Sequence, residues 1–211
     1  MPMSKLFLFC FCLVSFTTGL AQKTPLSASE IKTFKEKAIA RNSAITSIKS
    51  DFTQYKHLDF LTDDIVTKGQ ILYKAPELVK WAYTDPYQYS VIFKEGKMYI
   101  DDDGKKSNID MSANALLEHL NTMMIQSVKG NMFSNNDFSI AYYKENKKYL
   151  LEFTPVDASL KNFLAVILIH FDAQDYEVTD LTFKEPSNDY TKVVLSNKVV
   201  NGSISDEAFI H

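Results

Sequence analysis

Residues 69–83 read Gly-Gln-Ile-Leu-Tyr-Lys-Ala-Pro-Glu-Leu-Val-Lys-Trp-Ala-Tyr and contain the only tryptophan of the chain, Trp81. Apolar and polar residues alternate in each half, which is the period of a strand that buries one face. Pro76 separates the halves, because proline has no amide hydrogen for a sheet and restricts its own φ. The stretch therefore predicts two adjacent strands with a shared aromatic face. Such a face, without polar chemistry, indicates a surface that holds an apolar ligand.

The N-terminus has the features of an export signal. Lys5 precedes an apolar run over residues 6–16 that is too short to span a bilayer, and small residues precede a cleavage site after Ala21. We expect residues 1–21 to be removed and residues 22–211 to form one domain. Both cysteines lie within the signal, so we expect the exported domain to have neither a disulfide nor thiol chemistry.

The composition fits one globular domain and argues against a nucleic-acid-binding protein. The formal net charge is −3 for the whole chain, and removal of Lys5 would make it −4. An acidic balance gives no basic footprint for nucleic acid or for an anionic membrane surface. The chain has 15 Phe and 11 Tyr, which bury or bind a large apolar area. No repeat or linker marks a second domain, and we expect a monomer.

The chain predicts an α+β, mainly β fold in which helices cover the concave side of one curled antiparallel sheet. A capping box from Ser27 to Glu30 and apolar residues at helical spacing predict a long helix over residues 31–52. Period-two patterns bounded by turns predict strands over residues 65–75, 79–83, 89–94, 98–101, 138–144, 149–154, 163–171, 178–183 and 191–200.

Two of these segments have special patterns. Residues 163–171 are apolar on both faces, which predicts a central strand that is covered on each side. From Ser112 the period becomes helical, with an apolar stripe that either packs into the core or forms a movable cover over a ligand. The stripe consists of Leu116, Leu117, Leu120, Met123 and Met124.

No catalytic or metal-binding pattern occurs in the sequence. The four histidines are scattered, and no His-Glu-x-x-His, Cys-x-x-Cys or Gly-x-Ser-x-Gly motif is present. The acidic run that starts at Asp101 has its glycine at the fourth position and Ser112 at the twelfth, so it fits a turn better than a calcium loop. We expect no enzyme, no metal and no cofactor, although an enzyme without a known motif stays open.

Several short motifs, in order and over nearly the whole expected domain, together resemble the LolA family of outer-membrane lipoprotein carriers. No single motif is specific. They are Asp51-Phe52-Thr53-Gln54, Gly69-Gln-Ile-Leu-Tyr73, Pro76-Glu-Leu-Val-Lys-Trp81-Ala-Tyr83, Asp85-Pro86, Glu95-Gly96-Lys97, Leu151-Glu-Phe-Thr-Pro155, Val178-Thr-Asp-Leu-Thr-Phe183 and Ile204-Ser-Asp-Glu-Ala-Phe209.

The resemblance implies a periplasmic carrier with an incomplete β-barrel and helices over its open side. Such carriers hold the acyl chains of lipoproteins in a cavity and shuttle them from the inner to the outer membrane. The implied partners are acylated lipoprotein cargo, an inner-membrane ATP-driven lipoprotein-releasing transporter and an outer-membrane acceptor. We expect a cavity lined by Phe52, Ile71, Tyr73, Val79, Trp81, Tyr83, Val91, Phe93, Met98 and Ile100, with Leu116, Leu117, Leu120, Met123 and Met124 as its cover.

One position departs from the family pattern. Family members commonly carry an arginine just before the proline, tied to closure of the cover and cargo release, whereas this chain has Ala75 there, preceded by Lys74. The departure favours another cargo, and three other readings of the whole chain stay open. They are a related carrier of another acylated cargo such as a glycolipid or pigment, a periplasmic lipid-binding sensor, and an enzyme that acts on lipids.

Overall fold

A computed structural model describes residues 23–113, 133 and 137–211, and one twelve-stranded antiparallel sheet dominates this part of the chain. The strand order is β1-β8-β9-β10-β11-β12-β2-β3-β4-β5-β6-β7. The edge strands β1 and β7 do not pair with each other, so the sheet is not closed into a barrel.

The strands are β1 (Thr24–Pro25), β2 (Ser47–His57), β3 (Ile65–Lys74), β4 (Leu78–Asp85), β5 (Tyr89–Lys94), β6 (Lys97–Asp102), β7 (Lys105–Asp110), β8 (Phe138–Glu145), β9 (Lys148–Pro155), β10 (Val166–Asp172), β11 (Val178–Lys184) and β12 (Tyr190–Val200). The helical elements are α1 (Ala28–Ser43), α3 (Ala158–Lys161) and the 3-10 turns η1 (Met111–Ala113) and η3 (Asp206–Phe209). Among the helices that the structure describes, none has the length and apolar character needed to cross a membrane.

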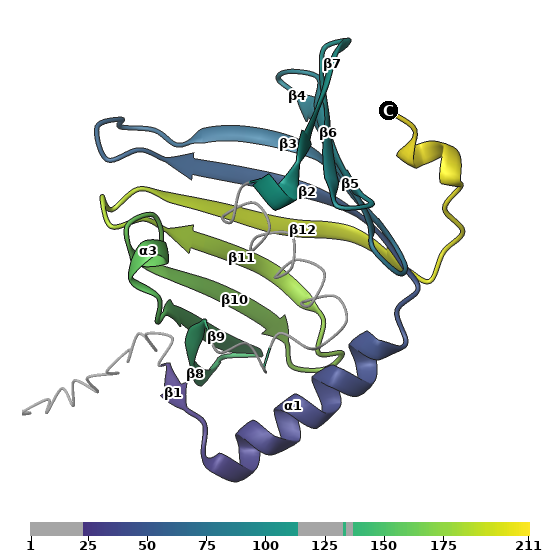
Figure 1. Cartoon of the computed structure of the whole chain (residues 1–211). Helices are drawn as coiled ribbons and strands as arrows, with labels where there is room; N and C mark the ends of the chain where they lie inside the picture. The colour runs from purple at the N-terminus through teal and green to yellow at the C-terminus, as the bar shows by residue number, and fades with distance from the viewer. Residues whose placement is uncertain (1–22, 114–132, 134–136) are drawn as a thin grey trace, which may run out of the picture.

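The sheet is strongly curled, and α1 packs against one of its faces (Figure 1). In Figure 1 the strands β5 to β7 stand at a steep angle to β10, β11 and β12. The Phe34 ring of α1 lies 5.3 Å from the Phe171 ring of β10, between ring centroids. We call the face that carries Phe171 the inner face, and the opposite face the outer face. The predicted curled, mainly β fold is confirmed.

The predicted helix over residues 31–52 is wrong in its second half. The capping box forms as expected, since the Ser27 amide donates to the Glu30 carboxylate, but α1 ends at Ser43 and residues 47–57 form β2. Ile48 and Phe52 lie four residues apart, a spacing that suits one face of a helix and equally one face of a strand. Pairing of β2 with β3 and β12 decides between them, and these partners are distant in sequence.

The acidic run that starts at Asp101 forms a hairpin turn between β6 and β7, as the sequence predicted in preference to a calcium loop. Asp103 and Gly104 both have positive φ, at 49° and 86°, and the Gly104 amide donates to Asp101 Oδ1 at 2.7 Å. The turn leads into β7, which the sequence did not predict. All six residues of β7 are exposed, so this edge strand needs no apolar alternation.

The segment at residues 163–171 was predicted to be a strand covered on both faces, and this is wrong in two respects. β10 begins only at Val166, and Phe163 is exposed. Within β10 the inner-face residues Ile167 and Phe171 are buried while the outer-face residues are half-buried. One reason is His170, which sits on the outer face among polar groups rather than in an apolar core.

The main core lies between α1 and the strands β8 to β11. It consists of Phe34, Ala38, Phe138, Tyr142, Leu151, Phe153, Leu160, Ile167, Ile169 and Phe171. The only arginine of the chain, Arg41, fixes the last turn of α1 to this half of the sheet through an ion pair with Glu177. Lys198 of β12 lies 3.1 Å from the same carboxylate, so the buried Glu177 is paired twice.

The outer face of β10 and β11 carries a polar network around His170. Its Nδ1 lies 2.7 Å from Asp180 Oδ1, and its Nε2 lies 3.3 Å from Glu145 Oε2. Lys148 and Thr179 donate to the other Asp180 oxygen. The hydrogen bond to Asp180 raises the pKa of His170. Burial alone would raise the pKa of Asp180, but the hydrogen bonds that Asp180 accepts outweigh burial and lower that pKa. His170 is thus a satisfied residue, as the sequence indicated.

These shifts predict a stability maximum on the acidic side of neutrality. The contribution of His170 to the free energy of unfolding is complete below about pH 6.5, the pKa of an unfolded histidine. It is lost as the pH rises through the raised pKa of the folded state. The contribution of Asp180 is present above about pH 4 and is lost as pH falls through its lowered pKa. Urea unfolding should show that Asp180→Asn has a free energy of unfolding about 2 kcal/mol below that of wild type at pH 6. At pH 8 this difference should be smaller.

The control for this pH dependence is a double-mutant cycle with His170→Gln. If the pair is responsible, either single variant removes the pH dependence and the double variant removes no more. An equal gap between wild type and Asp180→Asn at the two pH values would contradict the assignment.

Candidate functional site

The ten strand residues expected to line the cavity all lie on the inner face, in one connected patch. Strand register places Phe52 opposite Gly69, and Gly69 opposite Tyr83. Trp81 lies between Ile71 of β3 and Val91 of β5. The remaining members follow in the same register: Tyr73 opposite Val79, Val79 opposite Phe93, Phe93 opposite Met98, and Val91 opposite Ile100. The five cover residues, Leu116, Leu117, Leu120, Met123 and Met124, lie outside the described residues.

An aromatic cluster forms the centre of this patch. The Phe52 and Trp81 rings lie 4.7 Å apart between centroids, and the Tyr83 ring meets Phe52 edge-on at 5.3 Å. Phe52 is buried, whereas Trp81 and Tyr83 are half-buried. Phe52 therefore supports the cluster from beneath, and the partly exposed rings supply the surface that a ligand could contact.

The patch is larger than the sequence predicted, because inner-face residues of β11 and β12 continue it. Leu195 pairs with Phe52, and Leu181 of β11 pairs with Val193 of β12. The alternation in these strands was visible in the sequence. Their position beside β2 was not, since β12 returns to pair with β2 from the far end of the chain.

Gly69 begins one of the motifs shared with the family, and the structure shows why this position needs a glycine. A Cβ atom there would lie 2.6 Å from Phe52 Cζ and 2.0 Å from the Ala82 carbonyl oxygen. The glycine therefore leaves the space in which the Phe52 ring lies across β3. A glycine in a strand often marks such a close approach.

The ten side chains of this patch are all uncharged at neutral pH. Burial raises the pKa of Tyr73 and of Tyr83, and the Tyr83 hydroxyl donates to Gln54 Oε1 at 3.0 Å. Toward α1, burial raises the pKa of Tyr142 to about 12. Neutral aromatic side chains favour apolar ligands such as acyl chains over charged ones.

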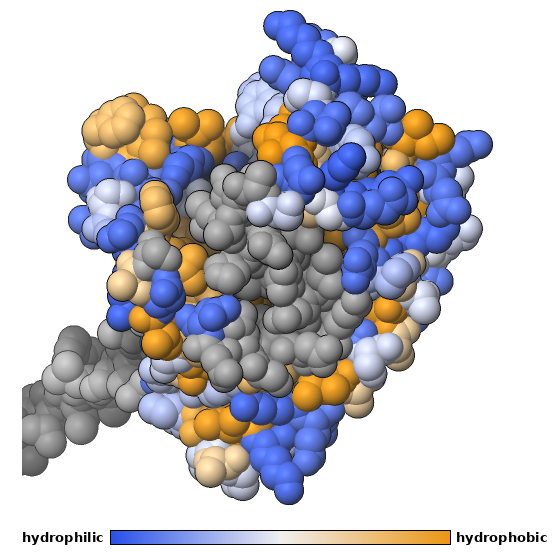
Figure 2. Space-filling model, viewed as in Figure 1, coloured by the Kyte–Doolittle hydropathy of each residue, from blue (hydrophilic) through white to orange (hydrophobic). Residues whose placement is uncertain are grey.

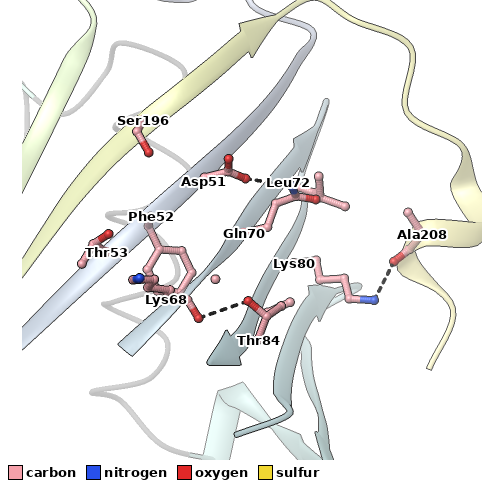
Figure 3. Close-up of a pocket in the computed structure, with 12 residues that line it drawn as sticks. Asp51, Phe52, Thr53, Lys68, Gln70, Leu72, Lys80, Thr84, Ser196 and Ala208 are labelled. Carbon is pink, nitrogen blue, oxygen red and sulfur yellow. Dashed lines mark hydrogen bonds between the residues drawn. The ribbon is translucent and has the colours of Figure 1, made fainter. Parts of the chain in front are cut away.

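A pocket of about 630 Å³ lies on the outer face, between β2 to β4 and the C-terminal segment (Figure 3). Gln70 donates to Asp51 Oδ1 at 3.0 Å, and Lys80 donates to the Ala208 carbonyl at 3.1 Å. Lys68 and Lys80 lie on its wall together with Asp51, so this pocket, unlike the inner-face patch, carries charged side chains. The described residues include no group of three or more His, Cys, Asp or Glu side chains that could hold a metal ion.

The turn between β3 and β4 is where the sequence placed it, at Pro76, and Ala75 is exposed beside it. Lys74 does not project onto the inner face. Its Nζ donates to Asp206 Oδ1 at 2.6 Å and to the Ile204 carbonyl at 3.0 Å, both in the C-terminal segment. Lys74 is therefore bound on the outer face. Ala75 carries no charge, so neither of these two residues presents a cation to the inner face.

The fold and the site define a class: an open, curled antiparallel sheet whose inner face carries a patch of uncharged aromatic and aliphatic side chains. Residues 43–210 match the family model described as outer membrane lipoprotein carrier protein LolA. The chain belongs to the LolA family.

Two solved structures share this fold at low sequence identity. An uncharacterized conserved protein from Thermus thermophilus has a TM-score of 0.53 and 6% identity, over 85% of this chain and 92% of that chain. MucB in the Pseudomonas aeruginosa MucA/MucB complex has a TM-score of 0.50 and 8% identity, over 86% of this chain and 61% of that chain. A LolA superfamily protein from Nitrosomonas europaea has a TM-score of 0.45 and 12% identity, over 85% and 97%. No curated protein matches this chain.

Proposed function

We propose that this protein is a periplasmic carrier that binds the acyl chains of lipoproteins on its inner face and shuttles them from the inner to the outer membrane. The observation that supports the proposal is the connected, uncharged apolar patch centred on Trp81, in a chain of the LolA family. Half-buried aromatic and aliphatic side chains on a curled sheet can surround acyl chains without polar contacts.

Energetics require partners for such a carrier. Each buried methylene is worth about 0.8 kcal/mol, so three long acyl chains hold a lipoprotein in a membrane by on the order of 30 kcal/mol. Non-covalent affinities saturate near about 20 kcal/mol, so a carrier cannot extract its cargo by affinity alone. An inner-membrane ATP-driven transporter would load the carrier and an outer-membrane acceptor would unload it. The carrier itself has no Gly-x-x-x-x-Gly-Lys motif for ATP.

The proposed cover is the apolar stripe from Leu116 to Met124, outside the described residues. Without cargo the stripe would close on the half-buried Trp81 surface, and cargo would displace it. Loading and release can be nearly balanced only if the cover packs weakly, because a ligand shifts such an equilibrium by no more than its differential affinity.

The proposal is tested by recovering the protein from the bacterial envelope and identifying bound molecules by mass spectrometry. We expect acylated species with wild type, and their loss with Val91→Glu, which would place a charge on the inner face. Ser90→Glu is the matched control. The Ser90 side chain is half-buried like that of Val91, the next residue, but it lies on the outer face. It should retain the cargo.

The same measurement identifies the cargo class. Acylated proteins would support lipoprotein transport, whereas a bound glycolipid or pigment would assign the inner face to another acylated cargo. If wild type carries no acylated molecule under conditions in which a control carrier retains its own, the proposal fails.

A further inference from the structure

Large apolar side chains gather in the solvent at one end of the sheet. The described residues include eleven exposed large hydrophobic side chains. Six of these belong to the β2–β3 hairpin or to the segment between β9 and β10: Phe60, Leu61, Ile65, Val66, Val156 and Phe163. We call these six residues the apolar rim. Phe60 is 80% exposed and Phe163 is 63% exposed, values far from those of core aromatic residues.

Strand register places the two parts of the rim at the same end of the sheet. Val166, the first residue of β10, pairs with Lys184, the last residue of β11. Lys184 pairs with Tyr190, and Tyr190 pairs with His57 at the end of β2. The loop that carries Phe163 and the hairpin after His57 therefore extend in the same direction. Figure 1 shows α3 and the β2–β3 hairpin on the same side of the molecule.

The hairpin projects beyond its neighbour β4. Residues 65–67 of β3 pair with β2, whereas pairing with β4 begins only at Lys68. The start of β3 is therefore a free sheet edge, and its adjacent residues Ile65 and Val66 point to opposite faces and are both exposed. In Figure 2 an apolar cluster marks the place where Figure 1 shows the end of this hairpin.

The base of the hairpin is held in place although its tip is apolar and exposed. His57 stacks on Tyr190 with the rings 4.8 Å apart, and its Nδ1 lies 2.8 Å from Asp64 Oδ1. The Asp59 amide donates to Asp189 Oδ1 at 2.8 Å. The fold thus holds Phe60 out in solvent by specific contacts on both sides.

We propose that the apolar rim is a membrane-contact site that inserts Phe60 and Phe163 into the interface of a lipid bilayer. Four rim residues lie in loops and two at the exposed start of β3, and none of them lines the outer-face pocket. From β9 to β3 they spread over five strand spacings, roughly 25 Å. A bilayer surface can receive all of these side chains together. Contact at the rim is independent of the inner face and adds to the proposed function a means of meeting a membrane.

The charge around the rim selects an uncharged bilayer. The loops over residues 58–64, 156–165 and 185–189 contain six acidic residues and one lysine, and one of the six, Glu185, is paired with Lys56 of β2. An anionic membrane attracts basic segments and repels acidic ones within about a Debye length. A bilayer of zwitterionic phosphatidylcholine is therefore the expected partner, and added phosphatidylglycerol weakens the contact.

The test is co-sedimentation with phosphatidylcholine vesicles, using protein recovered from the envelope so that every variant has the same N-terminus. Phe60→Ser combined with Phe163→Ser lowers the partition coefficient at least about tenfold, since each ring loses its burial in lipid. Val199→Ser is the control. Val199 is 53% exposed but pairs with Lys49 near the opposite end of β2, and its replacement leaves the partition coefficient unchanged.

Two further measurements make the result specific. The indole introduced by Phe60→Trp is quenched by lipids brominated in their acyl chains, beyond any quenching of Trp81 in wild type. Binding of a fluorescent fatty acid is unchanged in the double serine variant, which separates the rim from the inner face. The proposal is overturned if wild type does not bind the vesicles, if the double variant binds as wild type does, or if the introduced indole is not quenched.

Discussion

Gly69→Ala is expected to lower the free energy of unfolding by about 3 kcal/mol or more, the upper part of the range for overpacked positions. The added Cβ would lie 2.0 Å from the Ala82 carbonyl oxygen, a backbone atom that cannot move without opening the β3–β4 ladder. It would also lie 2.6 Å from Phe52 Cζ. Either the ladder opens or the Phe52 ring leaves β3, and both disturb the centre of the inner face.

Urea unfolding measures the loss, and the fluorescence of Trp81 reports its cause because the Phe52 ring lies 4.7 Å away. Gly96→Asn is the control. Gly96 has a φ of +73° at a hairpin turn with no atom within 4 Å of an added Cβ, and asparagine tolerates positive φ. It should cost little. A Gly69→Ala protein within about 0.5 kcal/mol of wild type would show that the Phe52–Gly69 contact does not organise the site.

Trp81→Ala is expected to weaken acyl-chain binding far more than it weakens the fold. An indole buries roughly 200 Å², and if about half of that area contacts an acyl chain the loss is roughly 2 kcal/mol, or about thirtyfold in affinity. Trp81 is only half-buried in the protein, so its own packing contributes less to stability than that of a core aromatic residue. Titration with a fluorescent fatty acid and urea unfolding measure the two effects separately.

Ile92→Ala is the control for Trp81→Ala. Ile92 is buried on the neighbouring strand β5, but it pairs with Lys80 and so lies on the outer face. Its truncation should cost about 3 kcal/mol of stability and leave fatty-acid affinity nearly unchanged. If the two variants lose affinity equally, Trp81 acts through the fold and not by contact with the ligand.

Local patterns in the sequence predicted most of the strands because each has its own period and its own turn. The segments around Trp81, the turn at Pro76 and the capping box at Ser27 all carry signals that involve neighbouring residues only. The errors occur where the signal is ambiguous or missing. Residues 47–57 satisfied two periods at once, and β7 has no apolar alternation at all.

For the candidate site, alternation grouped nine of the ten lining side chains on one face of each strand, because residues two apart on a strand share a face. Phe52 was included only through the family resemblance, since its segment was predicted to be helical. The sequence could not show that β11 and β12 extend this face, since their contact with β2 joins segments more than a hundred residues apart. It also could not show that Lys74 binds the C-terminal segment on the outer face. Both depend on the closure of long loops.

The sequence by itself determined the strand periods, the uncharged aromatic character of one face and membership of the LolA family, because these reside in residue types and short spacings. Only the tertiary structure decided where α1 ends, how Phe52 fits over Gly69, and which loops meet at the apolar rim. These features arise when antiparallel pairing selects one register among several that the local pattern allows. Once the register is set, residue 69 must be a glycine to admit the Phe52 ring, and the hairpin that carries Phe60 extends beyond β4.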